Sequence, residues 1–237
     1  MSYQTIFQRH ENKYLITREQ QQRMLEGIAA YMRPDAYGRS TIRNVYFDTP
    51  DHRLIRRSLE KPVYKEKLRV RSYVTAQPDS PVFVEMKKKY KGVVYKRRIS
   101  LPEETAMAYL CRRQPVGDSQ IVRELDWFLD FYGNLRPAMF LSYERQAYYG
   151  REDSGLRLTF DEQILWREDR LSLQEPPDGA ALLPPDKVLM ELKTPTALPL
   201  WLTDLLTHER IFRTSFSKYG TAYLTTQSNK EDISHVY

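Results

Sequence analysis

Hydrophobic and polar residues alternate along much of this chain, which is the period-two pattern of β-strands with one apolar face. Between residues 65 and 71 the odd positions are all Lys or Arg, whereas Leu68 and Val70 occupy even positions. A strand directs alternate side chains to opposite faces, so this segment has one basic face and one largely apolar face. The same alternation predicts strands over residues 5–16, 41–47, 62–74, 81–90, 93–101, 138–149, 155–162 and 187–193.

Apolar residues at helical spacing interrupt these strands and predict helices over residues 17–32, 51–59, 103–113, 119–132 and 199–212. Thr17 is the expected N-cap of the first helix, because a hydroxyl can accept a hydrogen bond from an early backbone N–H. The proline-rich stretch 175–185 is expected to be a loop, since a strand pattern resumes directly after it. We therefore expect a single domain over residues 1–237, with a frayed polar tail from about residue 227.

The polar faces of the predicted strands are rich in charge, with Arg and Lys joined by isolated Glu or Asp. Any one of these strands taken alone fits an antiparallel sheet with a solvated polar face. The amphipathic helices, however, need a sheet face to cover, and the apolar strand faces supply it. We therefore expect an α+β fold, a closed antiparallel eight-stranded β-barrel with a polar, basic interior and helices packed outside.

The composition is typical of a soluble globular protein and excludes several other classes. Hydrophobic residues make up 41% of the 237 positions, enough to bury a core. No apolar run reaches the roughly 18 residues of a membrane span, and the N-terminal segment lacks the apolar region of a secretory signal. Cys111 is the only cysteine, which excludes an internal disulfide and favours a reducing, cytoplasmic location. The histidines match no zinc spacing.

The charge pattern points to a polyanionic ligand. The net charge is +6, and the sequence contains none of the glycine-rich motifs that cradle phosphate with backbone N–H groups. Several cations gathered inside a barrel cannot remain unpaired, because desolvating like charges together is costly. The few carboxylates among them can hold a hard divalent cation that bridges ligand oxygens. A nucleic-acid-binding barrel is disfavoured, because the cations share their faces with carboxylates and no regular aromatic stacking platform is evident.

Ordered motifs from about Phe7 to Leu224 resemble the VTC domain, the polyphosphate polymerase branch of the triphosphate tunnel metalloenzymes. Each short motif is weak alone, but their order and spacing together are specific. The wider superfamily opens with ExExK, whereas Arg9 replaces the first Glu here, which resembles the VTC branch. The motifs are Glu11-Asn12-Lys13-Tyr14, Tyr46-Phe47-Asp48-Thr49, Lys67-Leu68-Arg69-Val70-Arg71, Phe83-Val84-Glu85-Met86-Lys87, Lys96-Arg97-Arg98, Tyr143-Glu144-Arg145, Leu156-Arg157-Leu158-Thr159-Phe160-Asp161, Glu191-Leu192-Lys193 and Ser217-Lys218-Tyr219.

The resemblance implies a set of site residues. It suggests Glu191 as the principal metal ligand, with Glu11, Glu85 and Asp161 as weaker candidates, and Mn²⁺ or Mg²⁺ as the metal. Within the catalytic set, the residues expected to bind ATP are Arg69, Arg71, Arg145, Arg157 and Lys218. The whole phosphate-binding and catalytic set is Lys13, Arg69, Arg71, Lys87, Lys96, Arg145, Arg157, Lys193 and Lys218.

The function that the resemblance implies is a metal-dependent polyphosphate polymerase, which transfers the terminal phosphoryl group of ATP to a growing polyphosphate chain. Two alternatives remain open from the sequence: a triphosphatase that uses water as acceptor in the same tunnel, and a non-catalytic polyphosphate sensor. The expected ligands are ATP, triphosphate and polyphosphate, with no nucleic acid. Direct membrane insertion is not expected, although the resemblance allows a membrane-protein partner at the inner face of a membrane.

Overall fold

The computed structural model describes residues 10–91 and 93–234, and side chains as far as residue 229. Residues 5–9 of the first predicted strand, including Arg9, and residues 235–237 of the tail lie outside this part. The strands are β1 (His10–Thr17), β2 (Met32–Asp48), β3 (Tyr64–Ser72), β4 (Pro81–Tyr90), β5 (Val93–Pro102), β6 (Arg136–Gly150), β7 (Arg157–Arg167), β8 (Ala180–Ala181) and β9 (Lys187–Thr194). The helices are α1 (Arg18–Ile28), α2 (Arg53–Leu59), α3 (Glu103–Arg112), α4 (Gln120–Tyr132), α5 (Leu200–His208) and α6 (Lys218–Ser234).

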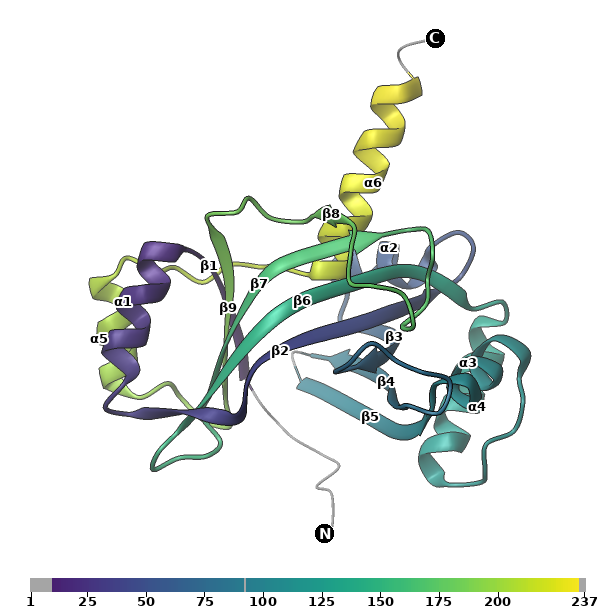
Figure 1. Cartoon of the computed structure of the whole chain (residues 1–237), viewed down its shortest axis with the longest axis horizontal. Coiled ribbons are helices and arrows are strands. Elements are labelled where there is room, and N and C mark those ends of the chain that lie inside the picture. The colour runs from purple at the N-terminus through teal and green to yellow at the C-terminus, as the bar shows by residue number, and fades with distance from the viewer. Residues whose placement is uncertain (1–9, 92, 235–237) are drawn as a thin grey trace.

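The strands form one antiparallel sheet with the order β1-β9-β7-β6-β2-β3-β4-β5, and β8 adds to β7 (Figure 1). The α+β class and the antiparallel sheet are as predicted. The closed barrel is a wrong expectation, since no hydrogen-bonded ladder joins β1 to β5 among the described residues. Alternation specifies which side chains share a face, but it carries no information on whether the first and last strands pair.

The sheet curls strongly even though it is not closed by hydrogen bonds. Lys87 of β4 donates to the Glu11 carboxylate of β1 at 3.3 Å, although these strands lie near opposite ends of the order. The segment before α6 lies between them: Thr214 pairs with Lys13 of β1, and Ser217 accepts from Lys67 of β3 at 2.8 Å. One face of the sheet is therefore turned inward, and we call it the inner face.

Helices cover the outer face in two separate groups, at the two ends of the sheet in Figure 1. Helices α1 and α5 bury Met24, Ile28 and Leu202 against apolar residues of β1, β7 and β9. At the other end, α3 and α4 bury residues such as Tyr109 and Phe128 against β3 and β4. Thr17 caps α1 as predicted, because its hydroxyl accepts from the backbone N–H of Gln20 in a capping box.

The start of α6 packs against the inner face and anchors one end of it. Tyr219 stacks on Tyr46 of β2 with ring centroids 4.7 Å apart, and its hydroxyl donates to Asp48 at 2.9 Å. The buried Asp48 carboxylate also accepts from the backbone N–H groups of Leu54 and Ile55 in α2. This one carboxylate therefore ties β2, α2 and α6 together.

Three helix predictions need correction. The helix predicted over residues 17–32 ends at Ile28, and Met32 already begins β2. Helix α6 was not predicted, and it continues to Ser234, so residues 227–234 of the expected frayed tail are helical. In Figure 1 the far end of this helix projects from the body of the molecule. The predicted helix 199–212 ends already at His208. In α6, Ala222 and Tyr223 pack on the sheet, but the sequence beyond them lacks a continuous apolar stripe from which a helix could be recognised.

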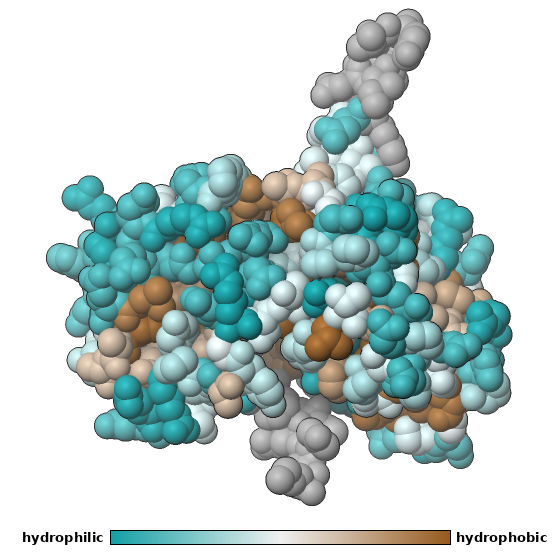
Figure 2. Space-filling model, viewed as in Figure 1, coloured by the Kyte–Doolittle hydropathy of each residue, from teal (hydrophilic) through white to brown (hydrophobic). Residues whose placement is uncertain are grey.

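The surface seen in Figure 2 is mostly hydrophilic, with hydrophobic areas over the α1/α5 end and the α3/α4 end. Within the part of the chain that the structure describes, every helix is too short or too polar to cross a lipid bilayer.

Candidate functional site

The inner face gathers the charged residues that the alternation singled out. The strand residues of the predicted set all lie on it, and Lys218 reaches it from the first turn of α6. The predicted residues are contributed by β1 (Glu11, Lys13), β3 (Arg69, Arg71), β4 (Glu85, Lys87), β5 (Lys96), β6 (Arg145), β7 (Arg157, Asp161), β9 (Glu191, Lys193) and α6 (Lys218). The structure thus brings these residues together, while their individual roles remain predictions.

Three lysines lie side by side in the sheet: Lys67, Lys87 and Lys96 are paired directly across β3, β4 and β5. Like charges directly opposite one another in a sheet are destabilising. Two of the three are neutralised, since Lys87 meets Glu11 and the Lys96 ammonium lies 2.6 Å from Glu85. We call these residues the lysine row.

Lys67 stands apart within the lysine row. Its ammonium donates to the Ser217 hydroxyl at 2.8 Å, and no carboxylate pairs with it within the described residues. Burial lowers the pKa of Lys67 well below its usual value, and the charges of Lys13, Lys87 and Lys65 lower it further. This is a partly buried position where a lysine has no carboxylate partner in the part of the chain that the structure describes.

Beside the lysine row, Arg69, Glu85 and Arg98 form a second row across the same three strands. Arg69 donates two hydrogen bonds to one Glu85 oxygen, at 2.7 and 2.9 Å, and Arg98 binds the other oxygen. Burial alone would raise the pKa of Glu85, which is 1% exposed, but Arg69, Arg71, Lys96 and Arg98 hold it well below its usual range. Glu85 is therefore an anion that fixes the surrounding cations in place.

A second group of charges, the Glu191 cluster, comprises Glu11, Lys13, Arg145, Asp161, Glu191, Lys193 and Lys218. Arg145 forks onto Asp161 with two hydrogen bonds of 2.6 Å. Lys218 lies 2.5 Å from Asp161 and 3.4 Å from Glu191. Lys13 and Lys193 each approach Glu191 to 3.3 Å. Asp161 and Glu191 are thus surrounded by four cations on the inward faces of β1, β6 and β9 and at the start of α6.

The acids of this cluster are ionised. Burial would raise the pKa of Glu191, but Lys218, Lys13, Lys193 and Arg145 together hold it well below its usual range. The pKa of Glu11 falls to about 2, because the charges of Lys87, Lys193 and Lys13 outweigh the opposing effects of burial and of Glu191. Among the cations, the pKa of Lys193 is lowered because burial outweighs its attraction to Glu191.

Arg71 and Tyr143 connect the two groups. Arg71 donates to the Asn44 side chain at 3.0 Å and to the Tyr143 hydroxyl at 3.1 Å. The Tyr143 ring also lies beneath Lys218, 4.4 Å from its centroid. Burial would raise the pKa of Tyr143, but Arg71, Arg145 and Lys218 lower it to about 8. Arg71 is held by these two neutral oxygens, and its Nε lies 3.9 Å from Glu85, too far for a hydrogen bond, so part of its charge remains available to a ligand.

Arg157 is a further cation without a carboxylate partner in the described part of the chain. Its buried Nε atom has no hydrogen-bond acceptor, and its guanidinium lies over the Tyr149 ring at 4.7 Å from the centroid. A buried donor left unsatisfied is costly unless a ligand supplies the acceptor. Together with Lys67 and Arg71, it marks where anionic oxygens can be accepted.

The sequence-based set omitted three residues that the structure places in this site: Lys67, Arg98 and Tyr143. A signal for the first two was present, because they alternate with apolar residues on the same strand faces as Arg69 and Lys96. Tyr143 gave no such signal, since a tyrosine at an inward position is equally typical of a packed core.

The carboxylates do not build a complete metal site by themselves. Within residues 10–91 and 93–234, no three acidic, histidine or cysteine side chains are grouped closely enough to hold an ion. The charge of Glu191 raises the pKa of both Glu11 and Asp161, so these three carboxylates lie in one group. Glu85 lies apart from them, in the row with Arg69 and Arg98. Mg²⁺ in phosphate-transferring sites is usually bound by one or two carboxylates plus substrate oxygens. Glu191 with Glu11 fits such a partial site once a phosphate ligand contributes, and Glu85 does not belong to it.

The family follows from the sequence as a whole. The model of the VTC domain family matches residues 8–227, nearly the entire chain. The chain belongs to the VTC domain family. Among curated proteins, no sequence matches this VTC domain.

Several solved structures are similar to this chain at low sequence identity. A candidate adenylate cyclase from Bacillus halodurans is 15% identical, with a TM-score of 0.57 over 90% of this chain and 96% of that one. A candidate adenylate cyclase from Vibrio parahaemolyticus is 10% identical, with a TM-score of 0.48 over 92% and 98% of the two chains. A Pyrococcus horikoshii protein is 12% identical, with a TM-score of 0.46 over 92% and 99%. At such identities the first likeness concerns the fold alone.

Proposed function

We propose that this VTC domain is a metal-dependent polyphosphate polymerase that transfers the terminal phosphoryl group of ATP to the end of a polyphosphate chain. The observation that carries the proposal is the lysine row with its unpaired member, Lys67. Carboxylates compensate Lys87 and Lys96 but not Lys67, and a polyanion along the inner face supplies the negative charge that this lysine lacks. Family membership supports the same class of ligand.

An extended phosphate chain fits the arrangement better than a single phosphate. Lys67, Arg69 and Arg71 follow one another on the same face of β3, so they span about 13 Å along the strand. Arg157 and the Glu191 cluster continue the charged surface on the opposite part of the sheet. A ligand with several linked phosphates can contact all of these groups at once, whereas one phosphate cannot.

The chemistry then depends on positioning and charge neutralisation. In phosphoryl transfer, the bond from the terminal phosphorus to the leaving oxygen breaks while a bond to the acceptor oxygen forms, and ADP leaves with the electron pair. The acceptor is a phosphate oxygen that is already ionised at neutral pH, so no protein nucleophile is required. Arg69 and Arg71 are assigned to the transferring group, because each guanidinium can direct two N–H donors at phosphate oxygens.

A divalent cation, when bound, would neutralise charge on the phosphate oxygens, and Glu191 with Glu11 are the residues assigned to hold it. The role of this chain's own residues is to keep those carboxylates ionised. Lys13, Lys193 and Lys218 do so by surrounding Glu191 at 3.3–3.4 Å.

The test is to incubate the purified protein with ATP and Mn²⁺ and to analyse the products by gel electrophoresis and by a free-phosphate assay. We expect polyphosphate chains longer than the triphosphate of ATP. Release of free phosphate alone would assign the domain as a triphosphatase, and neither product with retained triphosphate binding would assign it as a sensor. Lys67→Met is the matched negative control, since it removes the unpaired cation without touching a carboxylate.

A further inference from the structure

An aromatic pair lies on the exposed side of α4, a helix that covers the outer face of the sheet. Trp127 and Phe131 lie one helical turn apart, are 58% and 51% exposed, and stack with ring centroids 5.2 Å apart and planes 13° from parallel. The opposite side of the helix is already buried, through Leu125, Phe128 and Leu129 in the outer core. Packing of the fold therefore does not explain the aromatic pair.

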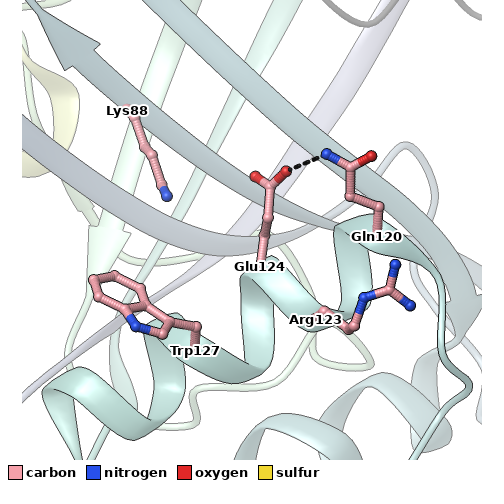
Figure 3. Close-up of a pocket in the computed structure, with 5 residues that line it drawn as sticks. All are labelled: Lys88, Gln120, Arg123, Glu124 and Trp127. Atoms are coloured by element: carbon pink, nitrogen blue, oxygen red, sulfur yellow. Dashed lines mark hydrogen bonds between the residues drawn. The ribbon is translucent and has the colours of Figure 1, made fainter.

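A groove of about 500 Å³ lies beside this pair, between α4 and β4. Figure 3 shows Gln120, Arg123, Glu124 and Trp127 projecting from α4, and Lys88 reaching from β4 toward them. We call these five residues the α4 groove.

The single carboxylate of the α4 groove is already engaged. Glu124 accepts from Arg97 at 2.9 Å and from Gln120 at 3.2 Å. Arg123 meets only Asp118, a largely exposed loop residue, at 2.8 Å. Lys88 lies 3.8 Å from the buried Glu66, and its ammonium is 5.9 Å from the centroid of the Trp127 ring. Each cation of the groove therefore has a carboxylate partner, but the pair of Arg123 with Asp118 is largely exposed on both sides and so contributes little, and an incoming carboxylate can compete for Arg123.

The two rings cover one face of each other, and cations lie near them. Lys88 approaches Trp127, the two rings stack on each other, and the Arg53 guanidinium lies 5.8 Å from the Phe131 centroid. An aromatic ring carries negative charge on its faces and positive charge at its edge. The exposed part of the pair is therefore apolar ring surface beside cations, which favours a ligand with both apolar side chains and carboxylates. Stacking of a nucleobase would require a free ring face.

We propose that the α4 groove binds an acidic segment of a partner protein, in which a bulky apolar residue adjoins the carboxylates. The carboxylates contact Arg123 and Lys88, and the apolar residue packs against the edges of Trp127 and Phe131. This surface lies on the outer face of the sheet, so its occupation does not compete with a ligand on the inner face.

The probe is a short fluorescein-labelled peptide in which glutamate and leucine alternate, with glutamine replacing glutamate in the comparison peptide. By fluorescence anisotropy at low salt, we expect a Kd on the order of 10⁻⁴ M for the acidic peptide, because the surface is small. Trp127→Ala and Arg123→Glu should each weaken binding by about tenfold or more. Arg123 is exposed and paired only with a loop residue, so its variant tests the proposal even where Trp127→Ala lowers stability.

Trp201→Ala is the matched control, because Trp201 belongs to the other half-exposed aromatic stack, with Tyr31 at 4.2 Å, on the α5 side. It should leave peptide binding unchanged. Equal binding of the glutamine peptide, no binding of the acidic peptide, or the same loss in Trp201→Ala would overturn the proposal. So would saturable binding of an oligothymidylate or of anionic lipid vesicles that Trp127→Ala abolishes, or a dimer that dissociates in that variant.

Discussion

Neighbouring inner-face positions on β3 differ sharply in how their charges are compensated. Arg69 is locked by two hydrogen bonds to Glu85, whereas Lys67, two residues earlier, has only a hydroxyl partner. Removing Arg69 leaves a buried carboxylate with fewer cations, so function and stability change together. Removing Lys67 leaves no carboxylate unpaired, so its effect on ligand binding can be distinguished from its effect on stability. Lys67 is therefore the more informative residue to substitute.

For Lys67→Met, we expect triphosphate affinity to fall by about tenfold or more, the usual loss for one charge-assisted contact. The ligand-free melting temperature should rise, since a partly buried lysine without a carboxylate partner in the described residues is removed. Calorimetric titration and thermal melts measure the two effects. Arg123→Gln, an exposed cation on α4, should change neither, and a lower melting temperature for Lys67→Met would contradict the unpaired state of this lysine.

Glu191→Gln should change the melting temperature and the triphosphate affinity in the opposite directions to Lys67→Met. The carboxylate neutralises Lys13, Lys193 and Lys218, so its loss should lower the melting temperature of the ligand-free protein. Triphosphate binding should be kept or become tighter, because one negative charge leaves the site. Metal-dependent turnover should fall by about tenfold or more at limiting Mn²⁺. Steady-state kinetics across a Mn²⁺ series would show this, and an unchanged Mn²⁺ requirement would remove Glu191 from the metal site.

Lys96 predicts a pH dependence of ligand binding. Burial lowers its pKa to about 7 despite the attraction of Glu85. Below that pH the ammonium is charged and attracts phosphate. Above it, a proton must be taken up on binding, so affinity should fall with rising pH, by up to about tenfold per pH unit.

Titrations with triphosphate between about pH 6 and about pH 8.5 can measure this, with Lys96→Arg as the reference, because arginine stays charged throughout. Ionisation of the ligand itself affects both proteins equally and cancels in the comparison. The wild-type protein should lose more affinity across this range than the variant. Parallel curves would show that Lys96 does not titrate in this range.

At the scale of elements, α6 matters because it joins the site to the scaffold. Its first residue, Lys218, enters the Glu191 cluster, and the next, Tyr219, donates to Asp48, which also accepts from the start of α2. A small shift of this turn therefore moves a cation of the site. The strands need no such anchor, since their registers fix the inward residues directly.

Tyr219→Phe should lower the free energy of unfolding by about 1.5–3 kcal/mol, the usual loss for a hydrogen bond to a charged group. Urea unfolding would measure the change. Tyr223→Phe is the control in the same helix, because the Tyr223 ring packs beside His52 and its hydroxyl has no bond to Asp48. It should change stability by less than about 0.5 kcal/mol. Equal effects of the two substitutions would contradict the anchoring role of the Asp48 bond.

At the scale of the whole molecule, the curl of an open sheet concentrates charge. Cations outnumber carboxylates on the inner face, and contacts such as that of Lys87 with Glu11 bring the sheet's two ends together. The electrostatic potential of such a surface attracts polyanions from solution, and dissolved salt screens it.

Triphosphate affinity should therefore weaken by about tenfold or more when ionic strength is raised from about 0.05 to about 0.5 M. The same measurement on Lys67→Met should give a shallower dependence, because one cation fewer contributes. Calorimetry at several salt concentrations provides the slopes. An affinity independent of salt would show that charge on the inner face does not govern binding.

The sequence by itself determined which residues of a strand share a face, because the period of a strand is strictly two, and on β3 the inward cations alternate with Leu68 and Val70. That is why the predicted set on β1, β3, β4, β5, β6, β7 and β9 lies together on one face. Only the tertiary structure decided which charges meet. Lys67, Lys87 and Lys96 lie on three successive strands, and the register between those strands placed them in one row. The register and curl of the sheet left Lys67 without a carboxylate, and they brought β1 against β4 without closing the barrel, because both depend on contacts between distant segments that no local pattern encodes.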